Sequence, residues 1–92
     1  MVSQLNLCKA FTYQVAKAIQ DGKWTGSEVA MAKNRSARMA QEICWEAVQI
    51  LGGAGCLEDS VVARLARDAR ILSIAGGTHE IMNEIVSSEI GL

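Results

Sequence analysis

Proline is absent from this chain, so glycine is left as the main residue that can interrupt a helix. Aromatic side chains are also scarce, since only two Trp, one Tyr and one Phe occur among 92 residues. Half of the sequence is nevertheless hydrophobic, and Ala, Ile, Val, Leu and Met supply most of that half. This composition is typical of a helical bundle, and a chain of this length forms one domain at most, here taken as residues 1–92.

An excess of charge is lacking as well, because nine basic residues face ten acidic ones and the net charge is −1. A surface for nucleic acid or for anionic lipid would need a clustered basic excess. No stretch approaches the roughly 20 apolar residues that a membrane span requires. The first residues include polar Ser3, Gln4 and Asn6 without a basic segment, so no signal peptide is expected.

Cysteine is present but does not form a recognisable pattern. Cys8, Cys44 and Cys56 are odd in number and contain no C-x-x-C pair. We expect each of them to pack as a small hydrophobic residue in a reducing compartment, with no disulfide and no metal site.

Apolar spacing and glycine positions predict an all-α fold of the up-and-down bundle type. Leu5, Cys8, Val15 and Ile19 recur at helical spacing, and Thr25 with Glu28 has the pattern of a capping box. Pairs of glycines then end or interrupt the pattern twice more. The predicted helices are 1–21, 26–51, 60–69 and 78–90. The first two are expected to be antiparallel neighbours because their loop is short.

The segment that ends the second predicted helix is a first candidate site, comprising Gln49, Ile50, Leu51, Gly52 and Gly53. Taken alone, it can be a plain helix C-cap with an exposed glutamine. A glutamine amide also offers donors and an acceptor, and glycine lets a ligand approach the backbone closely. No strand precedes these glycines, so the segment is not a dinucleotide fingerprint of the strand–turn–helix kind.

A second candidate site lies at the start of the last predicted helix. Gly76 and Gly77 precede Thr78, His79 and Glu80. Thr78 suits an ordinary N-cap, while the free N–H groups of a helix start also suit a ligand phosphate. A lone histidine is more often structural than catalytic, and we interpret His79 in this way.

Between the two candidates lie Arg64, Arg67, Asp68 and Arg70, which we interpret as a structural, charged helix surface. Glu28, Glu42, Glu46 and Glu58 are interpreted as solvated helix-face charges. Trp45 is expected to be packed because it lies in the middle of a helix, and Trp24 to cover one end of the bundle.

The three motifs Q-I-L-G-G, R-D-A-R-I and G-G-T-H-E-I, in this order, resemble the C-terminal domain of flavin-dependent acyl-CoA dehydrogenases. The resemblance is strong from about Lys33 to Leu92 and weaker before it. It implies that residues 49–53 contact the adenosine–pyrophosphate part of an FAD bound mainly by a neighbouring subunit. It also places Thr78, His79 and Glu80 at the flavin cofactor and Gly76 and Gly77 at the acyl-CoA. Because Glu80 would repel a diphosphate, we expect it to face the ribose or the ring.

The resemblance has departures as well as matches. The family often has aromatic residues where this chain has Ala54 and Cys56, and proline in place of Val61, which puts the loop geometry in doubt. Many relatives carry the catalytic glutamate at the position of Gly76, whereas glycine cannot accept a proton. In relatives with glycine there, the base comes from a helix that would precede Met1.

Two functional hypotheses follow. The first is the C-terminal part of an acyl-CoA dehydrogenase, inactive alone, with a bundle left incomplete without the upstream helix. It would form homo-oligomers in the cytoplasm, or in the mitochondrial matrix of a eukaryote. The second is a non-catalytic helical self-assembly module that binds no flavin.

Overall fold

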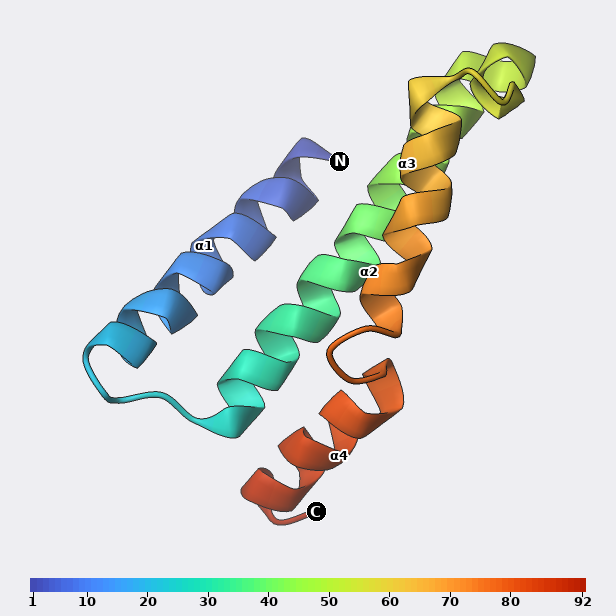
Figure 1. Cartoon of the computed structure of the whole chain (residues 1–92). Helices are drawn as coiled ribbons and strands as arrows, with labels where there is room; N and C mark the ends of the chain where they lie inside the picture. Colours follow the sequence, from blue (N-terminus) through green and yellow to red (C-terminus); the bar gives the residue numbers. More distant parts are fainter.

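The computed structural model describes all of residues 1–92, and every regular element in it is helical (Figure 1). Its four α-helices are α1 (Val2–Gln20), α2 (Gly26–Leu51), α3 (Val61–Ala69) and α4 (His79–Ile90). Two short 3-10 helices, η1 (Gly52–Cys56) and η2 (Arg70–Ser73), lie between them. The all-α prediction is confirmed, and each α-helix begins and ends within one residue of its predicted bounds. The segments 52–59 and 70–74, predicted as loop and connector, contain the two 3-10 turns.

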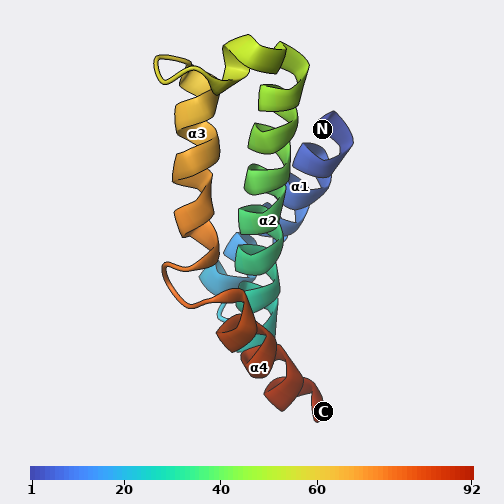
Figure 2. The ribbon, with the colours of Figure 1, turned by 90° about the vertical axis from the view of Figure 1, so that its right-hand side faces the viewer.

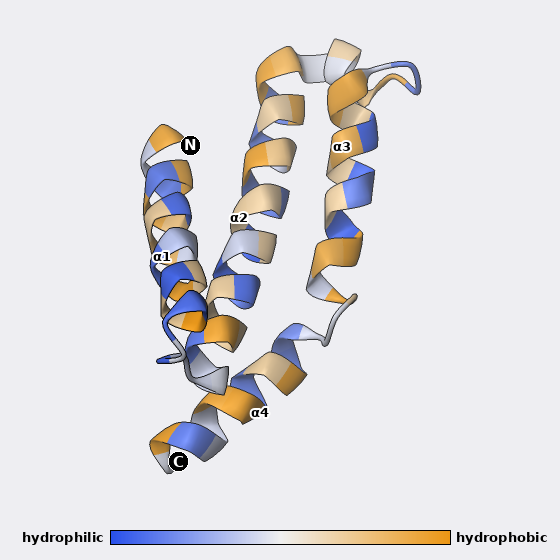
Figure 3. Ribbon diagram, turned by 60° about the vertical axis from the view of Figure 1, so that its left-hand side comes forward, coloured by the Kyte–Doolittle hydropathy of each residue, from blue (hydrophilic) through white to orange (hydrophobic).

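The long helix α2 is the centre of the molecule and packs against α1, α3 and α4. Helices α1 and α2 are antiparallel, and α3 runs back along the second half of α2 (Figures 1 and 2). Helix α4 continues beyond α3 toward the first half of α2. Figure 3 shows α1 and α3 on opposite sides of α2, with α4 passing below the start of α2. The arrangement is therefore open, 46 × 23 × 19 Å in extent, with one helix serving as the partner of three.

Small side chains form most of the interior. Ten of the 92 residues are buried, and the hydrophobic ones are Cys8, Val15, Ala30, Ala32, Ala37, Ala63 and Ala69. Alanine at the contacts allows helix axes to approach closely but buries little apolar area per residue. Much of the larger apolar surface therefore remains in contact with solvent.

Exposure of large side chains corrects one expectation from the sequence. Trp45, expected to be packed, is 70% exposed on α2. On α4, the apolar residues Ile81, Ile85 and Ile90 are also partly uncovered, at 49%, 37% and 58% exposed. Helical periodicity identifies the apolar residues of each helix, but α2 covers only part of the apolar face of α4.

The cysteines differ from one another in burial. Cys8 is buried between α1 and α2, where its thiol lies 3.9 Å from the Arg35 carbonyl oxygen. Cys44 is half-buried and Cys56 is exposed on η1. All three are free, so the prediction of no disulfide is confirmed. The expected packing role fits Cys8, and the exposed thiol of Cys56 contradicts it there.

No helix in the structure combines the length and the apolar character needed to cross a membrane.

Candidate functional site

The first candidate site is the last turn of α2 with the turn that follows it. Gln49, Ile50 and Leu51 are all exposed at this end of the helix. Gly52 ends the helix with φ +59° and ψ −141°, and its N–H donates to the Gln49 carbonyl oxygen. This positive φ favours glycine over any residue with a Cβ. The glutamine amide is thus presented to solvent beside a backbone turn that carries no side chain.

The neighbouring glycines have different roles. Gly53 does not have a positive φ, and a Cβ added to it would meet no atom within 4 Å. Gly55 is buried, and a Cβ there would lie 2.7 Å from the Val48 carbonyl oxygen. Close packing inside η1 therefore gives Gly55 the strictest steric requirement of this turn.

The second candidate site is the turn that leads into α4. Gly76 and Gly77 both have positive φ, +68° and +103°. Thr78 is the N-cap, and its hydroxyl accepts a hydrogen bond from the Ile81 N–H at 3.3 Å. The predicted cap is therefore confirmed. A Cβ at Gly76 would meet nothing within 4 Å, so open space surrounds the position where many relatives carry their base.

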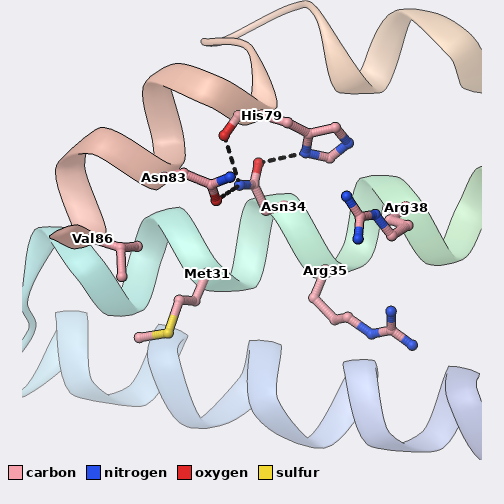
Figure 4. Close-up of a pocket in the computed structure, with 7 residues that line it drawn as sticks. All are labelled: Met31, Asn34, Arg35, Arg38, His79, Asn83 and Val86. Carbon is pink, nitrogen blue, oxygen red and sulfur yellow. Dashed lines mark hydrogen bonds between the residues drawn. The ribbon is translucent and has the colours of Figure 1, made fainter.

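Two residues of α2 hold this turn in place, and neither was identified from the sequence. Lys33 donates from Nζ to the Gly77 carbonyl oxygen. The Asn34 Nδ2 donates to the His79 carbonyl oxygen at 3.1 Å and to Asn83 Oδ1 at 3.0 Å (Figure 4). The His79 Nδ1 lies 2.7 Å from Asn34 Oδ1. These contacts join residues more than 40 positions apart, so no local pattern in the sequence could have indicated them.

Glu80 occupies the helix start that a phosphate would otherwise use. Hydrogen bonds from its own backbone N–H and from the Thr78 hydroxyl lower the pKa of this exposed carboxyl, and the charges of His79 and Arg70 act in the same direction. A negative charge already lies near the positive end of the α4 dipole. The backbone N–H groups at the start of α4 therefore fit hydroxyl groups of a ligand better than a second anion.

The structure does not bring the two candidate sites together. Asn34 of α2 contacts the start of α4. Gln49 lies 15 residues further along α2, which is roughly 22 Å at 1.5 Å per residue. Only a long cofactor, or a cofactor shared between two chains, could use both.

The arginine segment between the candidates contributes a structural contact. Arg70 donates to Gln41 Oε1 at 3.3 Å, and the Gln41 amide donates to the Ala37 carbonyl oxygen at 3.2 Å and to the Ser73 hydroxyl. These bonds attach η2 to the middle of α2 just before Gly76. They support the interpretation of this segment as a brace for the following turn.

Comparison with known proteins gives one consistent result. The family model described as the C-terminal domain of acyl-CoA dehydrogenase matches residues 1–91. A crystal structure of a probable acyl-CoA dehydrogenase from Mycobacterium abscessus has a TM-score of 0.95 and 41% identity, over 99% of this chain and 24% of that one.

Curated relatives lead to the same family. A 3-(aryl)acrylate reductase of Clostridium sporogenes is 34% identical over 98% of this chain, and bovine mitochondrial isovaleryl-CoA dehydrogenase is 33% identical over 94%. The chain spans 24% and 20% of these two relatives, respectively. Similarity thus extends along the whole of this chain but covers less than a quarter of each relative.

Proposed function

This chain belongs to the acyl-CoA dehydrogenase family, and we propose that it acts as the C-terminal domain of a flavin-dependent enzyme that acts on the α,β bond of an acyl-CoA thioester. The observation that carries the proposal is the whole-length match of sequence and fold to this domain of the family. The confirmed Thr78 cap and the Gly52 turn add local support, because both lie at positions for which the resemblance implies cofactor contact.

In the proposed enzyme, FAD supplies the acceptor for the hydride that leaves the β-carbon of the acyl group. The Gln49 amide and the turn of Gly52 and Gly53 bind the adenosine–pyrophosphate part of the cofactor. Thr78, His79 and Glu80 contact FAD at the second candidate site, with Glu80 directed at the ribose hydroxyl groups or at an N–H of the ring. These contacts bind and orient, and they transfer no proton.

The proton of the α-carbon needs an acceptor from outside these residues. Gly76 has no side chain, and it lies with Gly77 in the turn that we propose as part of the acyl-CoA wall. Both glycines of this turn have positive φ, and Lys33 donates a hydrogen bond to the Gly77 carbonyl oxygen. The chain therefore shapes the substrate pocket in this proposal, while the base is supplied by another segment or another chain.

The direction of the reaction is a second part of the proposal. The Clostridium sporogenes relative is named a reductase, and a reductase would run the hydride transfer in the opposite direction. The same binding contacts serve both directions, since they orient the cofactor and the α,β bond and do not determine which of the two donates the hydride. We favour dehydrogenation because the matched family model, the bovine relative and the Mycobacterium abscessus structure are all named dehydrogenases.

A domain exchange tests the proposal. The 92 residues would replace the matching quarter of the Mycobacterium abscessus chain, which has the same fold at a TM-score of 0.95. We expect the purified chimera to assemble and to show a bound flavin spectrum. Gln49→Ala should lower flavin retention, while Gln20→Ala, at the exposed end of α1, serves as the matched control. A chimera that assembles but never retains flavin would favour the alternative, a helical self-assembly module.

A further inference from the structure

A cleft between α2 and α4 gathers positive charge outside the proposed flavin contacts of residues 49–53. Its volume is about 330 Å³, and it is lined by Met31, Asn34, Arg35, Arg38, His79, Asn83 and Val86 (Figure 4). Two of these seven residues are arginines, one is the single histidine of the chain, and none is acidic. The chain as a whole has a net charge of −1, whereas the residues that line this cleft have a net positive charge.

The imidazole of His79 is held in one orientation. Asn34 uses Nδ2 as a donor to the His79 carbonyl oxygen and to Asn83 Oδ1, so its Oδ1 is the atom that faces the ring. An amide oxygen only accepts, and the His79 Nδ1 at 2.7 Å must therefore carry the hydrogen. Nε2 points away from Asn34 in Figure 4 and remains available to a ligand. A histidine anchored through one nitrogen in this way presents the other with defined geometry.

Helical spacing places Arg38 beside this ring, because Arg38 follows Asn34 by four residues. Arg35 also lines the cleft, but Figure 4 shows its side chain on the α1 side of α2, away from the imidazole. Figure 4 shows Arg38 on the same side of Asn34 as the imidazole. Arginine donates paired hydrogen bonds that suit the oxygens of a phosphate.

We propose that this cleft binds a phosphate group, with Arg38 and the His79 Nε2 as donors and Arg35 as a further positive charge at the edge of the cleft. A tetrahedral dianion accepts hydrogen bonds from several directions, whereas a planar carboxylate is satisfied by one guanidinium fork. Phosphate binding favours the doubly protonated imidazole, whose added proton comes from the solvent. The proposal shares His79 with the proposed flavin contacts but uses neither Gln49 nor the turn that follows it, and phosphate binding is tested without flavin.

Other charges near the ring are accounted for. Glu80 follows His79 on α4, and its carboxylate is engaged by its own N–H and by the Thr78 hydroxyl. Lys33 adds a positive charge at the same end of α4, where it donates to the Gly77 carbonyl oxygen. Arg70 acts on Glu80 from η2. Two of these three groups are cationic, so the surroundings as a whole still favour an anion.

The single histidine makes the test direct, because its ring signals in a ¹⁵N-resolved NMR spectrum need no assignment. Sodium phosphate would be titrated into the 92-residue chain at pH 7 and constant ionic strength. We expect the Nε2 signal to move, with saturation, from the position of an acceptor nitrogen toward that of a protonated one. A shift that grows linearly, or that sodium chloride reproduces, would mean ionic screening alone and would overturn the proposal.

Variants locate the site. Arg38→Gln should weaken phosphate binding by about tenfold or more, as expected for the loss of a charge-assisted hydrogen bond. Arg64→Gln, exposed on α3, is the matched control and should bind as the parent does. Arg35→Gln is the second variant if Arg38→Gln loses helical circular dichroism. Equal binding by the parent and by every folded variant of the two cleft arginines would contradict the proposal.

One further ligand, adenosine diphosphate, identifies the source of the phosphate once the site has been located. Adenosine diphosphate that binds at least about tenfold more tightly than inorganic phosphate would assign the cleft to a nucleotide. Equal affinity would assign it to the phosphate group by itself.

Discussion

Glu89 joins the last turn of α4 to the first turn of α2. Its Oε2 accepts a hydrogen bond from the Ser27 N–H at 2.7 Å, so a carboxylate caps the positive end of α2 from a distant part of the chain. Gly26 makes room for it, because a Cβ there would lie 2.5 Å from Glu89 Oε1. Hydrogen bonds from the Ser27 N–H, the Ser27 hydroxyl and the Gly26 N–H lower the pKa of Glu89.

The lowered pKa gives a prediction about acid stability. A carboxyl whose pKa is lower in the folded state stabilises the fold above its unfolded pKa, near 4.5, and loses this effect as the pH falls through the folded value. We expect Glu89→Gln to be less stable than the parent at pH 7, with the difference shrinking below about pH 4.5. Urea unfolding followed by circular dichroism between pH 7 and pH 3 measures this. Glu84→Gln, exposed on the same helix, is the control. A difference that stays constant with pH would contradict the assigned contact.

Gly52 and Gly53 give a second prediction at this scale. Gly52→Val places a β-branched residue at φ +59° and ψ −141° and should cost about 1–3 kcal/mol of folding free energy, the usual cost of a sparsely populated backbone conformation. Gly53→Val meets neither a positive φ nor a close atom, so its cost should be smaller. In the flavin-binding chimera, both variants should reduce flavin retention, because both side chains obstruct close approach. Equal loss of stability with unchanged flavin retention would remove this turn from the proposed site.

At the scale of elements, caps and glycines made the helices predictable. Thr25 accepts from the Glu28 N–H at 3.2 Å as the capping-box pattern indicates, and Gly52 ends α2 at the predicted residue. These signals are local, since a cap acts within one turn of its helix. The contacts that position α4 could not be predicted, because Lys33, Asn34 and Glu89 act across more than 40 residues of sequence.

Asn34 provides the test of how α4 is attached. Asn34→Ala removes the hydrogen bonds to the His79 carbonyl oxygen, the His79 ring and Asn83, and should cost roughly 1–3 kcal/mol, at about 1 kcal/mol for each net bond. The loss should be local, so amide hydrogen exchange should accelerate in α4 more than in α1. Asn6→Ala, exposed on α1, is the matched control. Uniform acceleration in all helices would mean that α4 does not open independently.

At the scale of the whole molecule, the two candidate sites lie too far apart to act as one site in this chain. Their proposed partners are other domains and other copies, and the residues of one chain supply orientation only. The sequence indicated both turns from their glycines, but it could not reveal their separation, because that depends on where α4 docks along α2.

The proposed division of labour gives a prediction about activity. The 92-residue polypeptide, supplied with FAD, an acyl-CoA and an artificial electron acceptor, should show no oxidation above the rate of the buffer. Gly76 offers no proton acceptor, and the turn that contains it is exposed to water. Absorbance of the reduced acceptor measures the rate. Turnover that remains with the chain through successive purification steps would show that a base lies within these residues.

The uncovered apolar faces lead to the last prediction, which concerns assembly. Helix α1 buries only Cys8 and Val15, while Leu5, Leu7 and Ile19 are 48%, 73% and 47% exposed. Burying a side chain of this size is worth about 1.5–3 kcal/mol, against a total stability of about 5–15 kcal/mol for a domain. Covering several of them with a second copy therefore changes the stability by a large fraction, and two antiparallel helix pairs can close into a four-helix bundle with two-fold symmetry.

We expect light scattering to report a homodimer or a larger oligomer at micromolar concentration, with a melting temperature that rises with protein concentration. Leu7→Glu should shift the chain toward the monomer, whereas Lys9→Glu, also exposed on α1, should not. A well-folded monomer whose melting temperature is independent of concentration would show that the small-residue core around α2 is sufficient by itself.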